Sequence, residues 1–538
     1  MTRPLDLASL PYPGRRQPLF APHGVVATSQ PLAAQAGLSI LKRGGNAVDA
    51  ALTTALTLAV VEPASCGVGG DVFALVWDGS RLSGLNGSGR SPGALTTEIV
   101  QSQGYQEIPA TGWLPVTVPG APAAWYDLHQ RFGSLPFDEI CAPAIDYAEH
   151  GYPITPTLQM YWQWALQTHR FLQGEEFRAF ETCFTNAGRV PEVGERWRNP
   201  DLARVLRLIA RKGAATFYQG EVAEEIAKFS ARTGGLLTAS DLATHTSTWV
   251  NPLSTGYRGY EVWEMPPNSQ GLTTLLALNL LEGFDLSRFP RESVESYHLQ
   301  VEATKLAFVD AQRFIADPER ATVPTAALLD PHYTQSRRTL IGELARLPKP
   351  GKPQGGGTAL LCTADAQGMM VSLIQSTSAL FGSHVVVPRT GFSLQNRGQG
   401  FSLDPEHPNR LEPGKRPFHT IIPGFLTYAG QAVGPFGVKG GHMQPQGHLQ
   451  MIVNTVDYGL NPQASLDAPR WFWEKGNAIQ VEPTVSPALV QALLARDHLV
   501  EIGHTMDVFG CGQIIWQLPA GIYVAGSDGR TDGCAIGY

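Results

Sequence analysis

The residue with the clearest potential for chemistry is Thr358, which follows three glycines and begins an apolar hairpin. Gly355, Gly356 and Gly357 have no side chains, so the backbone ahead of Thr358 can adopt strained dihedral angles. Two apolar runs then flank a turn that contains Gly368, which is the pattern of a β-hairpin. A threonine in this position can attack the carbonyl carbon of Gly357, and cleavage would leave it with a free α-amine that serves as base for its own hydroxyl. The alternative is a glycine-rich loop that simply enters a strand.

Two further patterns suit a site for amide chemistry. Gly440 and Gly441 stand between a predicted strand and a predicted helix over 447–458, where backbone N–H groups can hold an oxyanion. A plain turn between strand and helix is the alternative. Arg90 lies in a segment rich in glycine and serine, and is either a surface arginine or a guanidinium that binds a carboxylate.

No metal and no cofactor are expected. The six cysteines are scattered without CxxC pairs, which favours buried thiols in a reducing compartment. His442 and His448 are separated by six positions, a poor spacing for two ligands of one ion. The glycine turn over 65–71 joins a helix to a strand, the reverse of the order in a dinucleotide-binding loop, so we interpret it as tight packing.

Composition places the chain among ordinary globular proteins. Its 538 residues carry a net charge of −7 and no basic stripe, so a nucleic-acid partner is not expected. The N-terminus lacks the apolar core of a signal peptide, and the longest apolar stretch, over 52–61, is too short to span a membrane. A cytoplasmic protein without membrane contact is predicted, and its length indicates two lobes or one large multilayer domain.

Local signals indicate the elements that must position these residues. A helix is predicted over 31–44, and a second, buried on most sides, runs from Gly45 through Ala59 and is stopped by Pro63; a strand over 72–77 follows. A helix over 136–151 should kink or end at Pro143.

Three other segments carry expectations of their own. Residues 1–22 should form an extended arm. Residues 317–357 lack apolar periodicity, and an exposed segment there suits a cut end that must move away. Ser486 should cap a late helix that begins at Pro487.

Short motifs along the chain carry a family resemblance. They are Gly44-Gly45-Asn46-Ala47-Val48-Asp49-Ala50-Ala51, Val61-Glu62-Pro63, Val118-Pro119-Gly120, Tyr257-Arg258-Gly259-Tyr260, Met265-Pro266-Pro267, Phe381-Gly382, Lys415-Arg416-Pro417, Gly440-Gly441 and the closing Gly537-Tyr538. Over nearly its whole length the chain therefore resembles the γ-glutamyltransferase (γ-glutamyltranspeptidase) family of N-terminal-nucleophile hydrolases. The resemblance implies an α+β fold, a four-layer αββα sandwich in which helices cover two packed sheets.

The same resemblance implies a precursor that cuts itself between Gly357 and Thr358. The products would be a large subunit of residues 1–357 and a small subunit of residues 358–538, which stay together and can pair further into a dimer. The family's nucleophile falls on Thr358. Its supporting hydroxyl, a threonine in typical transpeptidases, falls on Ser376, and its oxyanion donors fall on the backbone of Gly440 and Gly441.

The chain departs from typical transpeptidases where they bind the glutamyl group. It has His419-Thr420 in place of a Ser-Ser pair, and Gln399 and Gly400 in place of the acidic residues that bind the α-amine. The arginine of their Arg-Glu motif is shifted by two positions to Arg90. Because a desolvated ammonium needs an anionic partner, these changes argue against a γ-glutamyl substrate.

The altered positions instead suit a small amide that bears a carboxylate. Either Arg90 or Arg397 would hold that carboxylate, His419 would position the substrate, and Thr420 would line the pocket. The variant pattern resembles the subgroup that includes the oxamate amidohydrolases of purine breakdown, so hydrolysis of oxamate to oxalate and ammonia is the leading expectation. The alternatives are a γ-glutamyl hydrolase or transferase acting on glutathione-type substrates, a glutaryl-type acylase, and a non-catalytic binding protein. Retention of Thr358 and Ser376 argues against the last.

Overall fold

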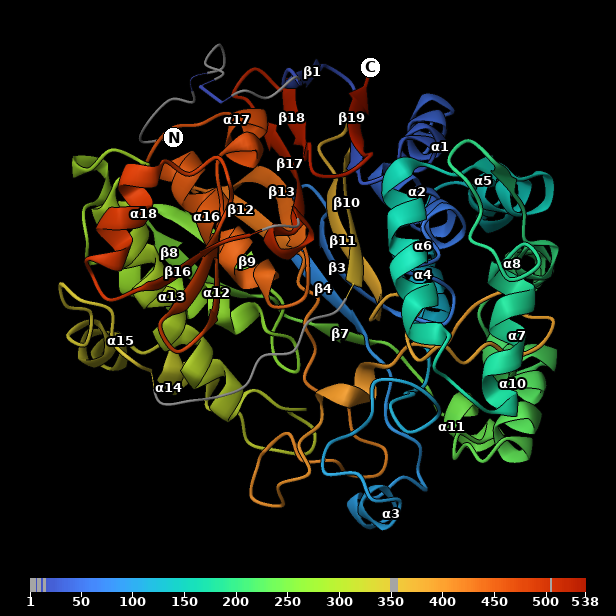
Figure 1. The fold of residues 1–538 in the computed structure, drawn as a ribbon. Coiled ribbons are helices and arrows are strands. Elements are labelled where there is room, and N and C mark those ends of the chain that lie inside the picture. Colours follow the sequence, from blue (N-terminus) through green and yellow to red (C-terminus); the bar gives the residue numbers. More distant parts are fainter. Residues whose placement is uncertain (1–5, 7–10, 13–15, 349–356, 504–505) are drawn as a thin grey trace.

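The computed structural model describes residues 6, 11–12, 16–348, 357–503 and 506–538. Two seven-stranded sheets face each other at the centre, and helices gather on the outer side of each sheet (Figure 1). The inner faces meet in one apolar cluster that includes Phe73 and Leu360 from one sheet and Phe425 and Ile515 from the other. This combination of helices and antiparallel sheets agrees with the predicted α+β class.

Both large sheets contain strands from before and after Thr358. In spatial order, the first consists of β1 (Leu19–Ala21), β18 (Tyr523–Ser527), β17 (Cys511–Gln517), β13 (Gln431–Lys439), β12 (Gly424–Tyr428), β9 (Tyr260–Glu264) and β8 (Leu253–Tyr257). The second consists of β19 (Cys534–Gly537), β2 (Val25–Thr28), β10 (Gly357–Ala364), β11 (Met370–Ser378), β3 (Asp71–Trp77), β4 (Leu82–Gly87) and β7 (Thr248–Val250). Since the two parts of the chain share both sheets, a backbone cut before Thr358 would leave the hydrogen-bonded core joined.

Smaller sheets lie outside this core. One consists of β14 (Trp471–Lys475), β15 (Ala478–Val481) and β16 (Leu499–Ile502), and the other of β5 (Tyr152–Pro153) and β6 (Arg196–Trp197).

Side chains alternate along the central strands, as expected for strands that are covered on both faces. In β3, Val72, Ala74 and Val76 pack against helices, whereas Phe73 and Leu75 face the other sheet. The helices of the second sheet's outer face are α1 (Pro31–Lys42), α2 (Ala47–Val61), α4 (Ala121–Phe132), α5 (Phe137–His150), α6 (Pro156–His169), α7 (Glu175–Phe184), α8 (Pro200–Lys212), α9 (Ala215–Gln219) and α10 (Glu221–Arg232). The helices of the first sheet's outer face are α12 (Gly271–Leu281), α13 (Val294–Phe314), α16 (Met443–Val456), α17 (Pro462–Asp467) and α18 (Pro487–Leu494). The remaining short helices are α3 (Thr97–Ser102), α11 (Ala239–Ala243), α14 (Thr325–Leu328) and α15 (Pro331–Arg338).

Several expected elements form as predicted. Every residue of α2 is buried, and Asn46 and Asp49 close its first turn with reciprocal hydrogen bonds. Ser486 caps α18, in which Pro487 is the first residue. At the end of the predicted N-terminal arm, β1 pairs with β18 as an edge strand. No helix of the described residues has the length and apolar character needed to cross a bilayer.

Three segments differ from the predicted local structure. Helix α5 forms as predicted but does not end at Pro143, one of the two alternatives given there, because its apolar side packs in the core and offsets the lost backbone hydrogen bond. Helix α16 begins at Met443 rather than near Gly447, with Pro445 in its first turn, where proline is tolerated. The segment over 317–348 is not featureless, since α14 and α15 form within it; residues 349–356 lie outside the described residues.

A buried ionic cluster supports the loop behind the glycine pair that follows β13. The carboxylate of Asp528 accepts hydrogen bonds from Arg470 at 2.7 Å, Arg530 at 3.0 Å and the Gly512 N–H at 2.9 Å. Arg470 also donates to the Gly510 carbonyl at 2.9 Å. Burial alone would raise the pKa of Asp528, but the two arginines outweigh it and lower that pKa to about 2.

Replacing Asp528 by asparagine should therefore lower the free energy of unfolding by about 3 kcal/mol near neutral pH, because among the described residues it leaves the buried guanidinium of Arg470 without a paired carboxylate, whereas Arg530 keeps its ion pair with Glu482. The folded pKa of about 2 lies below the ordinary value of 3.8, so this stabilisation is present above pH 3.8 and is lost as the pH falls towards 2. Urea unfolding of both proteins across this range measures the effect. Asp285→Asn, which removes an exposed ion pair with Arg288, is the control and should leave stability almost unchanged. Equal stability of Asp528→Asn and wild type at neutral pH would contradict the assignment.

Candidate active site

Thr358 is the second residue of β10 and lies at an irregularity in the pairing with β11. Gly357 is opposite Ser378, whereas Ala359 is opposite Gln375, so the Thr358 backbone lies beside the end of β11 that contains Ser376. The side chains of Thr358 and Ala359, and the glycines before Gly357, lie outside the described residues. The hairpin predicted around Gly368 is present, and that residue adopts a φ of +85°.

Three of the predicted site residues meet at this end of β11. Arg397 begins a short 3₁₀ turn and its side chain is buried. Its Nη2 donates to the Ser376 Oγ at 3.1 Å, and its Nη1 donates to the Thr420 Oγ1 at 2.7 Å. The Ser376 hydroxyl also accepts the Ser378 N–H at 2.8 Å. The tertiary fold thus joins residues from three separate segments around one guanidinium.

The charge of Arg397 is not paired directly with an opposite charge in the part of the chain that the structure describes. Among the described residues, no carboxylate forms an ion pair with Arg397, and its Nε has no hydrogen-bond partner. Burial lowers the pKa of Arg397 to about 10, while the charge of the nearby Asp71 opposes that change. At neutral pH the side chain is therefore a buried cation with donor capacity to spare.

His419 is held as a neutral ring behind Arg397. Its Nδ1 accepts the Ile421 N–H at 3.3 Å, so its Nε2 carries the hydrogen and donates to the Asp71 Oδ2 at 3.0 Å. Burial, together with the charge of Arg397, lowers the pKa of His419 well below its ordinary value. Both ring nitrogens are occupied, which fits the predicted positioning role better than general-base catalysis.

Asp71 is a site residue that the sequence analysis missed. Its Oδ1 accepts the Gly89 and Gly120 N–H groups at 3.1 Å each and the Gln395 amide at 2.8 Å. Burial raises the pKa of Asp71 to about 7, although the charge of Arg397 and these donors lower it. The signal that could have revealed it is a lone carboxylate at the first position of an otherwise apolar strand.

Arg90, the other predicted carboxylate-binding residue, is held elsewhere. Its guanidinium donates to Glu319 at 2.7 Å, and the same carboxylate pairs with Arg416 at 3.0 Å. The side chain of Arg90 is 25% exposed. Within the described part of the chain, no hydrogen bond or ion pair joins Arg90 to Ser376 or Arg397. Ion pairing at the surface therefore separates Arg90 from the buried cluster.

Gly440 and Gly441 lie between β13 and α16, as predicted, with φ values of +128° and +57°. No hydrogen bond from either N–H to another described residue is present. The Gln270 amide, which the sequence analysis also missed, donates to the Gly441 carbonyl at 2.9 Å and to the Thr420 carbonyl. Gln270 thus connects the glycine pair to Thr420, whose hydroxyl accepts a hydrogen bond from Arg397.

The two histidines near the glycine pair have separate surroundings. His442 bonds to the Gln270 side chain at 3.2 Å, and burial, with the Arg397 charge, lowers its pKa to about 4. His448 donates to Glu264 at 2.6 Å. The two rings therefore have different partners, each within a hydrogen-bonded network.

One protein family and several known proteins are similar to this chain over most of its length. The gamma-glutamyltranspeptidase family model matches residues 33–538. The chain is 38% identical to the glutathione hydrolase-like YwrD proenzyme of Bacillus subtilis, over 97% of this chain and 99% of that one. It is 33% identical to the oxamate amidohydrolase proenzyme of Klebsiella pneumoniae, over 96% and 98% of the two chains.

A solved structure is similar over the whole length. The cephalosporin acylase from Bacillus halodurans is 51% identical and superposes with a TM-score of 0.95, covering 100% of this chain and 99% of that one. The chain thus has a strand that contains Thr358, the nearby Ser376 hydroxyl, and two glycine N–H groups without a hydrogen-bond acceptor among the described residues. Its relatives include proteins named as hydrolase and acylase proenzymes. The chain belongs to the γ-glutamyltranspeptidase family and is a hydrolase of the N-terminal-nucleophile class.

Proposed function

We propose that this enzyme hydrolyses a small amide whose acyl part carries a carboxylate close to the reacting carbon, with oxamate as the leading substrate. The observation that carries the proposal is the buried Arg397, which forms no ion pair with a carboxylate of the described residues and whose Nη2 lies 3.1 Å from the Ser376 hydroxyl. A guanidinium binds a carboxylate through two parallel charge-assisted hydrogen bonds. The Nε and one Nη of Arg397 form a suitable pair of donors.

The position of Arg397 favours a short acyl group. Ser376 neighbours the backbone of Thr358 through the irregular pairing of β10 and β11. A carboxylate on Arg397 would therefore lie close to a carbonyl carbon under attack by Thr358. In oxamate the carboxylate and the amide carbon are directly bonded, whereas a glutaryl group separates them by three methylenes.

The proposed enzyme first processes itself. The Thr358 hydroxyl attacks the Gly357 carbonyl, and an N-to-O acyl shift converts the peptide bond into an ester. Water hydrolyses the ester, which leaves residues 1–357 with a new carboxylate and residues 358–538 with a free α-amine. The two packed sheets and their outer helices support the four-layer αββα arrangement of this enzyme class, in which such products stay associated.

In turnover, the α-amine of Thr358 accepts the proton of its own hydroxyl. The hydroxyl oxygen attacks the substrate amide carbon, and the N–H groups of Gly440 and Gly441 hold the resulting oxyanion. The α-ammonium returns its proton to the leaving nitrogen, which departs as ammonia. Water then hydrolyses the acyl-enzyme to oxalate and restores the threonine. His419 and Asp71 act by keeping Arg397 in place.

Replacing Gly440 by alanine should lower kcat by about 10²-fold to 10³-fold, the cost of one misplaced oxyanion donor. Gly440 has a φ of +128°, and an added Cβ would lie 3.1 Å from the Gly510 Cα, so the loop must shift. Steady-state kinetics measures the effect. Gly430→Ala is the matched control, because Gly430 has a φ of +73° in open space and should cost stability without a comparable loss of kcat. Equal losses in the two variants would argue against the oxyanion role.

A second candidate is an acylase that removes a glutaryl-type group. It is favoured by the 51% identity to a protein named cephalosporin acylase. Arg397 would then hold the distal carboxylate of a longer acyl chain, and the substrate would fold or extend further from Thr358.

The test is ammonia release from the amido acids oxamate, malonamate, succinamate and glutaramate, beside dye release from γ-glutamyl and glutaryl anilides. Highest kcat/KM on oxamate, with a steep fall at each added methylene, would support the proposal. Highest kcat/KM on the glutaryl compounds would support the acylase. Preference for the γ-glutamyl anilide would overturn the argument from the missing acidic residues.

A further inference from the structure

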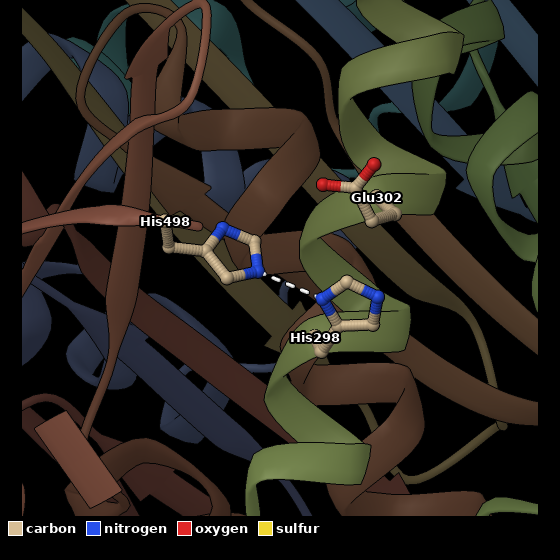
Figure 2. A group of neighbouring side chains, drawn as sticks. All are labelled: His298, Glu302 and His498. Atoms are coloured by element: carbon tan, nitrogen blue, oxygen red, sulfur yellow. Dashed lines mark hydrogen bonds between the residues drawn. The ribbon is translucent and has the colours of Figure 1, made fainter. Parts of the chain in front are cut away.

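A compact group of nitrogen and oxygen donors lies on the first sheet's side of the molecule, separate from the residues around Arg397. His298 and Glu302 are one helical turn apart on α13, and His498 comes from the turn before β16. Figure 2 shows the two imidazole rings facing each other, with the carboxylate further along the same helix. One donor atom from each residue lies within 4.8 Å of the others, and all three side chains are buried.

Hydrogen bonds fix the orientation of the first ring. The His298 Nε2 lies 2.8 Å from the Gly342 carbonyl, which can only accept, so Nε2 carries the hydrogen and Nδ1 carries a lone pair. That lone pair faces the His498 Nε2 at 2.8 Å. Histidines that bind metals characteristically donate their other N–H to a carbonyl or carboxylate in this way.

The second ring, that of His498, has a nitrogen that can take up a proton. Within the described part of the chain, the His498 Nδ1 has no hydrogen-bond partner although it is buried. For an ion to bind between the rings, His498 would move its proton from Nε2 to Nδ1, which conserves charge. Bonds of about 2.1 Å to each nitrogen at a tetrahedral angle would require the two nitrogens to separate by about 0.6 Å.

We propose that His298, Glu302 and His498 form a binding site for a divalent transition ion of the Zn²⁺ type, with water as the remaining ligand. Two imidazoles and one carboxylate are ligands that Zn²⁺ accepts, whereas Ca²⁺ and Mg²⁺ prefer all-oxygen sites. The His298 and Glu302 spacing of four residues places both donors on one face of the helix.

Lys305 opposes the ion and sets its affinity. Its ammonium donates to Glu302 at 2.6 Å and to Asn477 at 3.0 Å, so it competes for the carboxylate and repels a cation. The second Glu302 oxygen accepts only a long bond of 3.3 Å from the Arg346 N–H among the interactions of the described residues. That oxygen can coordinate a metal ion while Lys305 stays bound to the other oxygen. Because the nearby ammonium repels the ion, we expect a site of moderate affinity.

The site would join the two products of self-cleavage. His298 and Glu302 precede Thr358 in the chain, whereas His498 follows it, so a bound ion would bridge the large and small subunits. This bridging role rests on the proposed cleavage, but metal binding itself does not. The uncut Thr358→Ala chain should bind the ion with the same affinity as the processed protein.

The experiment is calorimetric titration of Zn²⁺ into EDTA-treated full-length protein, with the visible absorption of Co²⁺ as a report on the ligands. We expect one ion per chain, binding weakened at least about tenfold in Glu302→Gln, and a rise in Tm with Zn²⁺ that this variant lacks. Lys305→Met should tighten binding about fivefold, an outcome that misfolding would not produce.

The matched control is His150→Ala. His150 and Asp146 also lie four residues apart on a helix, but at the surface. Binding that His150→Ala abolishes, or that Glu302→Gln leaves unchanged, would place the ion elsewhere and overturn the proposal. Absence of saturable Zn²⁺ binding to both wild type and Lys305→Met would overturn it as well. If the ion binds but does not bridge two subunits, that result would count against the cleavage scheme and not against the metal site.

Discussion

Replacing Thr358 by alanine should leave the chain uncut and reduce amide hydrolysis to background, a loss of about 10⁵-fold or more. Alanine lacks the hydroxyl that would attack the Gly357 carbonyl. Without cleavage, no free α-amine forms at position 358, so both the nucleophile and its base are missing. Intact-mass analysis of the purified chain measures cleavage, and ammonia release from oxamate measures turnover.

Thr358→Ser is the informative control. It keeps a hydroxyl on the same backbone and should retain cleavage and measurable turnover, both slower than in wild type. A Thr358→Ala protein that is uncut yet active would refute the whole scheme. A cut Thr358→Ala protein would show that a different residue, or an added protease, performs the cleavage.

Replacing Arg397 by methionine should lower kcat/KM on oxamate by about 10³-fold. Two charge-assisted hydrogen bonds to the substrate carboxylate would be lost, each worth about 1.5–3 kcal/mol. Arg397→Lys, which keeps the charge without the fork of donors, should lose less, about 10²-fold. Steady-state kinetics on oxamate gives these values, and acetamide, which has no carboxylate, should respond little to either variant.

Arg90→Ala separates the two arginines that the sequence left open. Because Arg90 pairs with Glu319 and is partly exposed, its removal should change kcat/KM by about twofold or less. A large loss in Arg90→Ala, with little change in Arg397→Met, would transfer the carboxylate site to Arg90 and remove the argument for a short acyl group.

Sequence patterns predicted elements whose signals are local. The burial of α2 on all sides follows from its run of small and apolar residues, and the cap at Ser486 follows from the preference of serine for that position. Of the kink or end predicted at Pro143, the end does not occur, because apolar packing of α5, which is a tertiary contribution, outweighs the local cost of proline.

The site residues likewise divide into those that could be proposed from the sequence and those that only the fold distinguishes. Residue types and order along the chain were enough to propose Thr358 as the nucleophile and Gly440 and Gly441 as oxyanion donors, since each depends on its immediate neighbours. The choice between Arg90 and Arg397 was not available from the sequence, because both are arginines in glycine-containing segments. Only the fold decides that one meets Glu319 and the other meets Ser376.

Asp71 and the cluster of His298, Glu302 and His498 show most clearly what the sequence could not predict. Asp71 and His419 are 348 positions apart, and His298 and His498 are 200 positions apart. No local pattern records such pairings, because they arise when strands and helices from distant parts of the chain bury their polar groups together and must satisfy them there. The sequence alone indicated the family, led to the proposal of Thr358 as the nucleophile and predicted elements with strong local signals, and the tertiary structure decided which buried charges face one another.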